Sequence, residues 1–256
     1  MEAAVVKEGD WVLIYFSEKK SYVVRVEQGR QFHTTKGSID LGSLVGVEYG
    51  SRLETNVGEE FYVTRPLIVD RLSVLKRFTQ VIYPKDLAYL LLGSGVGPGS
   101  RVVEAGTGTG YLTSILAFYV RPSGRVFTYE AREDFYKMAV ENFERIGLLP
   151  YITVRKRNIK EGIKERNVDA VFLDMPDPWE VFGEAYSVLN HGGTINVFTP
   201  TTGQMSRSIE GLKRAGFKRV EAAEIMYRRY KASPRELRPE NVGIWHTGYI
   251  IRGQKL

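Results

Sequence analysis

The chain has 256 residues, 43% of them hydrophobic, and a formal net charge of +6 at pH 7. This length allows one large domain or two unequal ones. The absence of cysteine excludes disulfides, thiolate metal sites and cysteine nucleophiles, and the three scattered histidines (His33, His191 and His246) argue against a metal site built from histidine. No apolar run approaches the ~18 residues of a membrane helix and no signal peptide is recognisable, so we expect a cytoplasmic protein without metal or membrane.

The positive charge is concentrated in the later part of the chain. Residues 1–79 hold 11 basic and 11 acidic side chains, whereas residues 80–256 hold 25 and 19. The densest basic clusters are RKRNIKEGIKER (155–166) and RRYKASPRELR (228–238). Either these clusters form an ion-paired, solvated surface or they bind a polyanion, and composition leaves both interpretations open.

Residues 1–75 predict a small N-terminal β-domain. The runs WVLIYFS, SYVVRVE, GRQFHTTKGSI and EEFYVTRPL are short, rich in β-branched and aromatic residues, and separated by glycine and charged turns without a helical period. We therefore expect a barrel-like or sandwich domain there. VLKRFTQVIYPKD (74–86) would connect it to a second domain at residues 76–256.

From about residue 85 the pattern predicts strands that alternate with helices. The expected strands are RVVEAG, RVFTYE, ITVRKR, VDAVFLD and GTINVFTP, followed near the end by FKRVEAAEIM and WHTGYIIRG. The helix after Glu130 has one apolar face, made of Phe135, Met138, Ala139, Phe143 and Ile146. Such alternation is typical of an α/β domain with a parallel sheet.

The stretch VVEAGTGTGYLT (102–113) places Gly106, Gly108 and Gly110 between a strand and a helix. Glycine at these positions allows a sharp turn and a close approach of the backbone to a ligand. This turn alone does not identify the ligand, because dinucleotide enzymes and methyltransferases both contain one.

Two acidic residues near this turn favour S-adenosylmethionine over NAD. Glu130 lies twenty residues after Gly110, at the end of the next strand, where a carboxylate can bind both hydroxyls of an adenosine ribose. Glu104 would face the middle of the ligand, where it would repel a pyrophosphate and attract a sulfonium and an ammonium. The alternative is that Glu104 points into solvent or pairs with a lysine.

Asn158 ends the third strand of the second domain at the same rim. Its amide could bind the adenine edge of the cofactor while Ile159 covers the ring. Asn158 could equally be an ordinary helix N-cap, and the two roles are compatible.

The stretch LDMPDPWE (173–180) ends a buried strand with a carboxylate on proline-stiffened backbone. Asp174 would lie where ligands bind in open parallel sheets, next to the switch in strand order. Pro176 and Pro178 restrict the backbone and hold this carboxylate in place. Trp179 would either wall the pocket or, as the favoured interpretation, pack in the core, and Asp177 would form a turn or a cap.

A carboxylate at this place suits methyl transfer to a ring nitrogen such as N1 of adenine. That nitrogen has a free lone pair, so no proton has to be removed before attack. The product is cationic, and Asp174 could accept a hydrogen bond from the exocyclic amine, orient the base and offset the charge.

Five motifs together resemble the tRNA (adenine-N1)-methyltransferases, which modify the T-loop adenine at position 58 and, in archaeal members, also at position 57. They are VVEAGTGTGYLT, FTYE, LDMPDPWE, TQVIYPKD (79–86) and HTGYII (246–251). The resemblance covers nearly the whole chain and is strongest to the archaeal members. It implies a Rossmann-like S-adenosylmethionine-dependent fold with a mostly parallel seven-stranded sheet, a small N-terminal all-β domain and a homotetramer. The implied cofactor is S-adenosylmethionine, the product S-adenosylhomocysteine, and the partner the T-loop of tRNA.

The resemblance also assigns individual residues. The family's cofactor positions fall on Gln80, Gly106, Thr107, Gly108, Thr109, Gly110, Tyr111, Leu112, Glu130, Asn158 and Asp174. Its catalytic aspartate corresponds to Asp174 and its tyrosine near the target base to Tyr83, which would stack on a flipped adenine or instead anchor the linker as a buried aromatic. Many members have aspartate in place of Asn158, a departure that bears on the adenine contact.

The same resemblance suggests how tRNA is bound. Basic clusters would hold phosphates and provide affinity without sequence choice, and the N-terminal domain would read RNA shape or serve in oligomerisation. A protein L-isoaspartate O-methyltransferase shares the GTGTGY turn but lacks DMPDPW and the N-terminal β-domain. A non-catalytic tRNA-binding subunit would have lost the cofactor site, whereas Gly106, Glu130 and Asp174 are present here.

Overall fold

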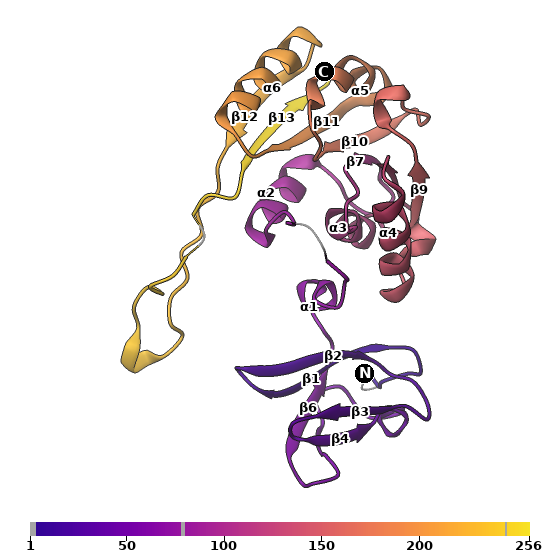
Figure 1. The fold of residues 1–256 in the computed structure, drawn as a ribbon, viewed down its shortest axis with the longest axis vertical. Helices are drawn as coiled ribbons and strands as arrows, with labels where there is room; N and C mark the ends of the chain where they lie inside the picture. The colour runs from indigo at the N-terminus through magenta and orange to yellow at the C-terminus, as the bar shows by residue number, and fades with distance from the viewer. Residues whose placement is uncertain (1–3, 78–79, 244) are drawn as a thin grey trace. The chain divides into compact units, whose positions relative to one another are not determined.

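The computed structural model of this protein describes residues 4–77, 80–243 and 245–256, and its chain divides into two compact units, Met1–Leu75 and Lys76–Leu256 (Figure 1). Thr79, the first residue of the TQVIYPKD motif, lies outside the described residues. Among the described residues, no helix combines the length and the apolar character needed to span a membrane.

The first unit contains one antiparallel sheet of four strands and a separate hairpin. The sheet has the order β2-β1-β6-β5 and consists of β1 (Trp11–Ser17), β2 (Lys20–Arg25), β5 (Arg52–Glu54) and β6 (Glu60–Thr64). The predicted run GRQFHTTKGSI is not one strand but the hairpin of β3 (Gln31–Thr34) and β4 (Gly37–Asp40), because the chain turns at Thr35 and Lys36 and enters β4 at Gly37 with a φ of +102°.

Two short helical segments interrupt this unit, although the sequence pattern predicted strands alone. They are the 3-10 turn η1 (Gly42–Leu44) and the one-turn helix α1 (Ile68–Leu72). The Asp70 carboxylate accepts a hydrogen bond from the Leu67 amide at 2.8 Å and so caps α1. The buried side chains that form the core of the unit include Ile14, Val24, Ile39, Phe61 and Val63.

The second unit is built on a seven-stranded sheet with the order β12-β13-β11-β10-β7-β8-β9. Its strands are β7 (Arg101–Ala105), β8 (Arg125–Glu130), β9 (Ile152–Lys156), β10 (Val168–Leu173), β11 (Leu189–Thr199), β12 (Lys218–Ala223) and β13 (Tyr249–Gln254). Only β13 runs antiparallel to its neighbours β11 and β12. The predicted mostly parallel seven-stranded α/β fold is therefore confirmed.

Helices cover both faces of this sheet (Figure 1). On one face lie α2 (Pro84–Ser94), α3 (Tyr111–Val120) and α4 (Glu133–Arg145), and on the other α5 (Phe182–Val188) and α6 (Thr202–Arg214). The connections contain the 3-10 turns η2 (Leu149–Tyr151), η3 (Ile159–Glu161), η4 (Pro178–Val181) and η5 (Pro234–Glu236). The predicted apolar face of α4 is buried except for Met138, which is half-buried.

The carboxyl ends of four parallel strands meet at one rim. The Asp174 amide donates to the Ala105 carbonyl at 2.9 Å, the Gly106 amide to Tyr129 at 3.3 Å, and the Arg157 amide to Glu130 at 2.9 Å. These bonds tie the ends of β10, β7, β8 and β9 together. The strand order reverses between β7 and β10, which is where ligands bind in open α/β sheets.

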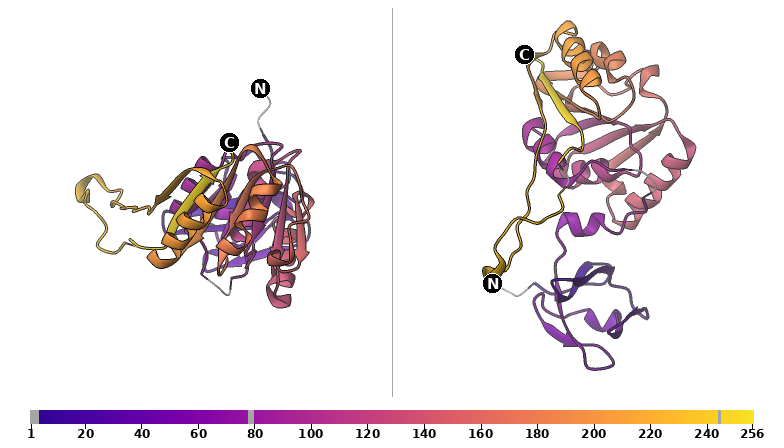
Figure 2. Two further views of the ribbon diagram at one scale, coloured as in Figure 1. Left: turned by 90° about the horizontal axis from the view of Figure 1, so that it is seen from above. Right: turned by 60° about the vertical axis from the view of Figure 1, so that its left-hand side comes forward.

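Residues 225–247, named the arm from here on, leave the sheet between β12 and β13 as a long protrusion (Figures 1 and 2). The described part of the arm, which excludes residue 244, is a hairpin: the Lys231 amide donates to Arg238 and the Glu240 amide to Arg229, both at 2.9 Å. The predicted strands FKRVEAAEIM and WHTGYIIRG are consequently shorter than expected, because their inner ends form the base of the arm.

Candidate functional site

A cavity of about 430 Å³ opens at the rim where the four strands end. Seven residues that the sequence assigned to cofactor binding line it together: Gln80, Gly106, Gly108, Glu130, Asn158, Ile159 and Asp174. The remaining lining residues are Ala105, Tyr129, Ala131, Arg132, Phe135, Arg157, Lys160, Met175 and Pro176. We call this the rim cavity.

The three glycines of the turn serve different purposes. A Cβ on Gly106, where φ is +91°, would lie 1.9 Å from the Asp174 carbonyl oxygen, and one on Gly110 would lie 2.3 Å from the Phe143 ring. These two glycines therefore permit close packing within the protein. At Gly108 the nearest atom to a Cβ would be 3.9 Å away, so of the three only this position leaves space for a ligand.

Glu130 is held at the end of β8 by backbone donors. One carboxylate oxygen accepts from the Gly108 amide at 3.0 Å and the other from the Arg132 amide at 2.9 Å. Each oxygen keeps a second lone pair, which can accept from a neighbouring hydroxyl. The geometry suits a pair of vicinal hydroxyls, as in a ribose.

Asn158 is both the cap of η3 and a lining residue of the rim cavity. Its side-chain oxygen accepts from the Lys160 amide at 3.0 Å, and its amide nitrogen has no hydrogen-bond acceptor among the described residues. Ile159 is buried and contributes an apolar wall beside it. The N-cap role is confirmed, and the position of Asn158 in the cavity lining is compatible with the adenine contact, which stays a prediction.

Asp174 follows β10 directly and presents its carboxylate to the rim cavity. The carboxylate remains in contact with solvent through the cavity, yet protein crowds it on its other sides, and this burial raises its pKa to about 6. Among the described residues no side chain donates a hydrogen bond to it. A group from a ligand can therefore take that position.

Glu104 does not face the rim cavity as expected. Side chains alternate along β7, so Val103 and Ala105 face the α5 and α6 side, whereas Glu104 faces α3 and is fully buried. One oxygen accepts from the Thr113 hydroxyl at 2.6 Å, and the other has no hydrogen-bond partner among the described residues. Burial raises the pKa of Glu104 to about 8. The prediction that a charged Glu104 faces the middle of the ligand is therefore wrong, and so is the alternative that Glu104 points into solvent or pairs with a lysine.

Several other residues of the sequence assignment lie away from the rim cavity. They are Tyr83 and five buried residues just before and at the start of α3: Thr107, Thr109, Gly110, Tyr111 and Leu112. The hydroxyls of Thr107 and Thr128 share a hydrogen bond of 2.5 Å, which ties the glycine-rich turn to β8. Tyr83 caps α2 and lines a second cavity of about 620 Å³ next to the arm, so it does not share one cavity with Asp174.

In the DMPDPW stretch, Trp179 and Asp177 have structural roles. Trp179 packs on the core beside α6, with the Arg207 guanidinium 5.5 Å from its ring centre. Asp177 adopts a left-handed conformation, with φ of +52°, and precedes η4. Core packing, the interpretation favoured for Trp179, is confirmed, and so is a turn-forming role for Asp177.

Arg132, Phe135 and Arg157 line the rim cavity, although the sequence assigned none of them to cofactor binding. The Arg132 guanidinium lies 3.9 Å from the centre of the Phe135 ring, which forms a cation–aromatic pair at the mouth. All three follow a strand end within a few residues. Position just after a parallel strand is the signal that would have identified them.

The basic cluster at residues 155–166 is largely ion-paired. Arg155 pairs with Glu165 at 2.5 Å, Arg157 with Glu161 at 3.2 Å, and Lys160 with Glu180 at 2.9 Å. In the cluster at residues 228–238, by contrast, Arg228 and Arg235 have no ion-pair partner among the described residues. Within the described parts of the chain, no group of acidic and histidine side chains is arranged to hold a metal ion.

Comparisons with known proteins agree with this geometry. A family model described as the tRNA methyltransferase complex GCD14 subunit matches residues 71–248. The tRNA (adenine(57)-N(1)/adenine(58)-N(1))-methyltransferase TrmI of Methanocaldococcus jannaschii is 32% identical, with the alignment covering 90% of each chain.

Solved structures match nearly the whole chain. A structure described as an S-adenosylmethionine-dependent O-methyltransferase of Thermotoga maritima has a TM-score of 0.86 and 36% identity, and covers 98% of this chain and 95% of that one. The tRNA (m1A58) methyltransferase TrmI of Aquifex aeolicus has a TM-score of 0.80 and 29% identity, with 99% of both chains covered.

The glycine turn makes a paired prediction about stability. Gly106→Ala should lower the free energy of unfolding by several kcal/mol, because the new Cβ would collide with the Asp174 carbonyl at 1.9 Å. Gly108→Ala should cost only about 1 kcal/mol, the usual strain of a left-handed alanine. Urea denaturation followed by tryptophan fluorescence measures both, and equal losses would contradict the assigned contact.

Glu104 predicts a specific dependence of stability on pH. Its pKa in the folded protein is raised from 4.5 to about 8, so the stabilisation from its bound proton is complete below pH 4.5 and is lost as pH rises through 8. Glu104→Gln stays neutral and should lack this loss, which we expect to be a few kcal/mol in the wild type. Denaturation at a series of pH values measures the free energy of unfolding of both proteins. If this free energy changed with pH equally in the wild type and in Glu104→Gln, the interpretation would be wrong.

Proposed function

Because this chain belongs to the tRNA methyltransferase family of the GCD14 subunit, we propose that it transfers a methyl group from S-adenosylmethionine to N1 of a T-loop adenine in tRNA. The target is adenine 58, and also adenine 57, the two positions in the name of the Methanocaldococcus relative. The observation that carries the proposal is the rim cavity, in whose lining the Glu130 carboxylate, the Asn158 side chain and the Asp174 carboxylate come together.

The residues of the rim cavity fit S-adenosylmethionine. Glu130 would accept from the two ribose hydroxyls, the amide nitrogen of Asn158 would donate to the adenine edge, and Ile159 would cover the adenine ring. Gly108 leaves room for the ligand beside the turn. When bound, the cofactor supplies an electrophilic methyl group on a sulfonium.

Asp174 would act on the base that receives the methyl group. The N1 lone pair of adenine needs no deprotonation, so a general base is not required. The Asp174 carboxylate would accept a hydrogen bond from the exocyclic amine, which fixes the base in line with the methyl group. Its negative charge would offset the positive charge that develops on the ring.

The tRNA would contact the arm and the second cavity. The arm carries five basic and two acidic side chains, and the free guanidinium groups of Arg228 and Arg235 are available to phosphates. Tyr83 is half-buried at the edge of the second cavity, where its ring could contact a nucleotide. We assign Tyr83 to the tRNA side of the reaction on this ground.

The domain organisation and the oligomeric state would be those expected from the family. Residues 76–256 would form the catalytic domain, and residues 1–75 the β-domain that reads RNA shape or joins subunits. A homotetramer is supported by apolar side chains on the arm that lie outside the second cavity and are unusually exposed for a free surface: Met226, Tyr230, Leu237 and Trp245.

An oxygen acceptor is the second candidate, because the Thermotoga maritima structure is described as an O-methyltransferase. A hydroxyl acceptor would need a base to remove its proton. Two carboxylates are found among the described residues that line the rim cavity, and Glu130 is already hydrogen-bonded to backbone amides. Asp174, with a pKa of about 6, would therefore be the base. Identification of the methylated atom separates this candidate from N1 methylation.

The activity can be tested with an unmodified tRNA transcript, S-adenosylmethionine and mass spectrometry of the released nucleosides. The wild type should form 1-methyladenosine, and Asp174→Asn should lower kcat roughly 100-fold or more while S-adenosylmethionine still binds, because the offsetting charge is lost. Asp177→Asn, in the same loop but outside the rim cavity, is the matched control and should stay within about twofold. Cofactor binding without any modified tRNA nucleoside would refute the proposed substrate.

The pKa of Asp174 predicts the acid limb of the pH profile. The ionised carboxylate is the active form, so kcat/KM for tRNA should be constant above about pH 6 and fall tenfold per unit below it. The amide in Asp174→Asn does not titrate in this range, so the residual kcat/KM of the variant should not fall as the pH is lowered. A limb that persists unchanged in the variant would assign the titration to another group.

A further inference from the structure

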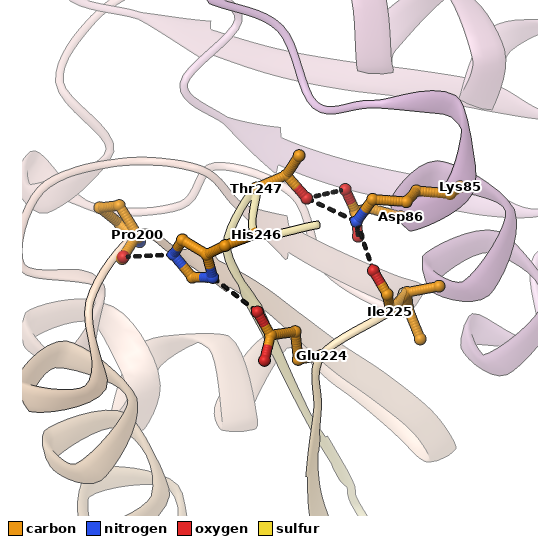
Figure 3. Close-up of polar contacts among 7 residues, drawn as sticks. All are labelled: Lys85, Asp86, Pro200, Glu224, Ile225, His246 and Thr247. Carbon is orange, nitrogen blue, oxygen red and sulfur yellow. Dashed lines mark hydrogen bonds and ion pairs between the residues drawn. The ribbon is translucent and has the colours of Figure 1, made fainter. Parts of the chain in front are cut away.

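Four residues from distant parts of the second unit form one hydrogen-bonded network at the base of the arm (Figure 3). The Lys85 ammonium donates to the Asp86 carboxylate at 2.8 Å, to the Ile225 carbonyl at 2.6 Å and to the Thr247 hydroxyl at 2.6 Å. The Thr247 hydroxyl donates to the other Asp86 oxygen at 2.6 Å. We call this network the clasp, because Ile225 and Thr247 are the two ends of the arm.

A second contact closes the base of the arm beside the clasp. His246 shares a hydrogen bond of 2.6 Å with the Glu224 carboxylate and lies 3.4 Å from the Pro200 carbonyl at the end of β11 (Figure 3). The two ends of the arm are thus joined to each other as well as to α2.

The clasp is buried and completely satisfied. The side chain of Lys85 is 8% exposed and that of Asp86 is 0% exposed. All three ammonium protons of Lys85 have an acceptor, and both oxygens of Asp86 accept. Because a buried ion pair contributes little net stability, its main effect here is to specify one arrangement of α2 and the arm.

The clasp joins the two walls of the second cavity. One wall is the start of α2, with Tyr83, Pro84 and Lys85, and the other is the arm, with Tyr227, Arg229, Glu240, Val242 and Gly243. Apart from its base, the described hydrogen bonds of the arm are internal to it. The separation of the walls therefore depends on the contacts at the base, which are the clasp and the His246 contact beside it.

We propose that Lys85, Asp86 and Thr247 are positioning residues for tRNA: they hold the arm against the start of α2, so that RNA bound along the arm meets Tyr83 in a cavity of fixed width. This role rests on the proposed function. None of the three residues lines the rim cavity, so their effect on cofactor binding is expected to be nil.

Thr247→Val tests the role, because it removes the bridging hydroxyl and leaves the Lys85–Asp86 pair in place. Thr194→Val is the matched control: the Thr194 hydroxyl is buried and donates to the Ser94 carbonyl at 2.8 Å, at the opposite end of α2 and away from the arm. A double variant, Lys85→Met with Asp86→Leu, removes the ion pair without leaving a single buried charge.

For Thr247→Val we expect kcat/KM for tRNA to fall about tenfold or more, as misplacement of a binding group does, while the dissociation constant of S-adenosylmethionine stays within about twofold. Trypsin should cleave the arm several times faster than in the wild type. Thr194→Val should lower the melting temperature but leave both tRNA kinetics and arm cleavage near wild type, and the double variant should behave like Thr247→Val.

The positioning role would be overturned if Thr247→Val and Thr194→Val lowered kcat/KM for tRNA equally. It would also be overturned if Thr247→Val lost affinity for S-adenosylmethionine in proportion to its loss of stability. A changed oligomeric mass of Thr247→Val in light scattering would also overturn it, because the effect on tRNA would then be indirect. If the wild type methylates no tRNA, the proposed function fails by itself. The comparison of tryptic cleavage then still decides whether the clasp holds the arm.

Discussion

The site depends on the close approach of two strand ends, those of β7 and β10. Gly106 lies so near the Asp174 carbonyl that a Cβ would come within 1.9 Å of it, and the Asp174 amide is bonded to Ala105. This contact brings the turn into α3 and the Asp174 carboxylate to one opening. Glu130 and Asn158 reach the same opening because β8 and β9 continue the sheet in register. A larger residue at Gly106 would separate these parts.

The same strand geometry gives the two acids near the turn different charges. Glu104 faces α3 and is enclosed, so burial raises its pKa to about 8, whereas Asp174 reaches the rim cavity and has a pKa of about 6. Near neutral pH, Asp174 is therefore ionised and Glu104 largely neutral. The carboxylates that line the rim cavity are thus Asp174 and Glu130, and not Glu104 as the sequence pattern suggested.

The parts of the site that could be predicted from sequence are those set by chain order and local pattern. Asp174, Glu130 and Asn158 each end a strand of a parallel sheet, and such ends share a rim whatever the side-chain packing. The direction of Glu104 was also accessible, since Val103 and Ala105 flank it and alternate residues face opposite sides. The arm was not: the predicted strand continues to Met226, whereas β12 ends at Ala223 and the Ile225 carbonyl accepts from Lys85, 140 residues away in the chain.

The two sides of the proposed reaction differ in how they are constructed. The rim cavity is formed by strand ends that a hydrogen-bonded sheet holds in place, and such elements keep reacting groups in position more accurately than loops do. The second cavity has one wall on the arm, whose described part is joined to the rest of its unit at the base. If tRNA binds as proposed, the arm accommodates this large and irregular partner without disturbing the methyl-transfer geometry. The buried clasp limits that freedom, because any shift of the arm must break hydrogen bonds to a buried charge.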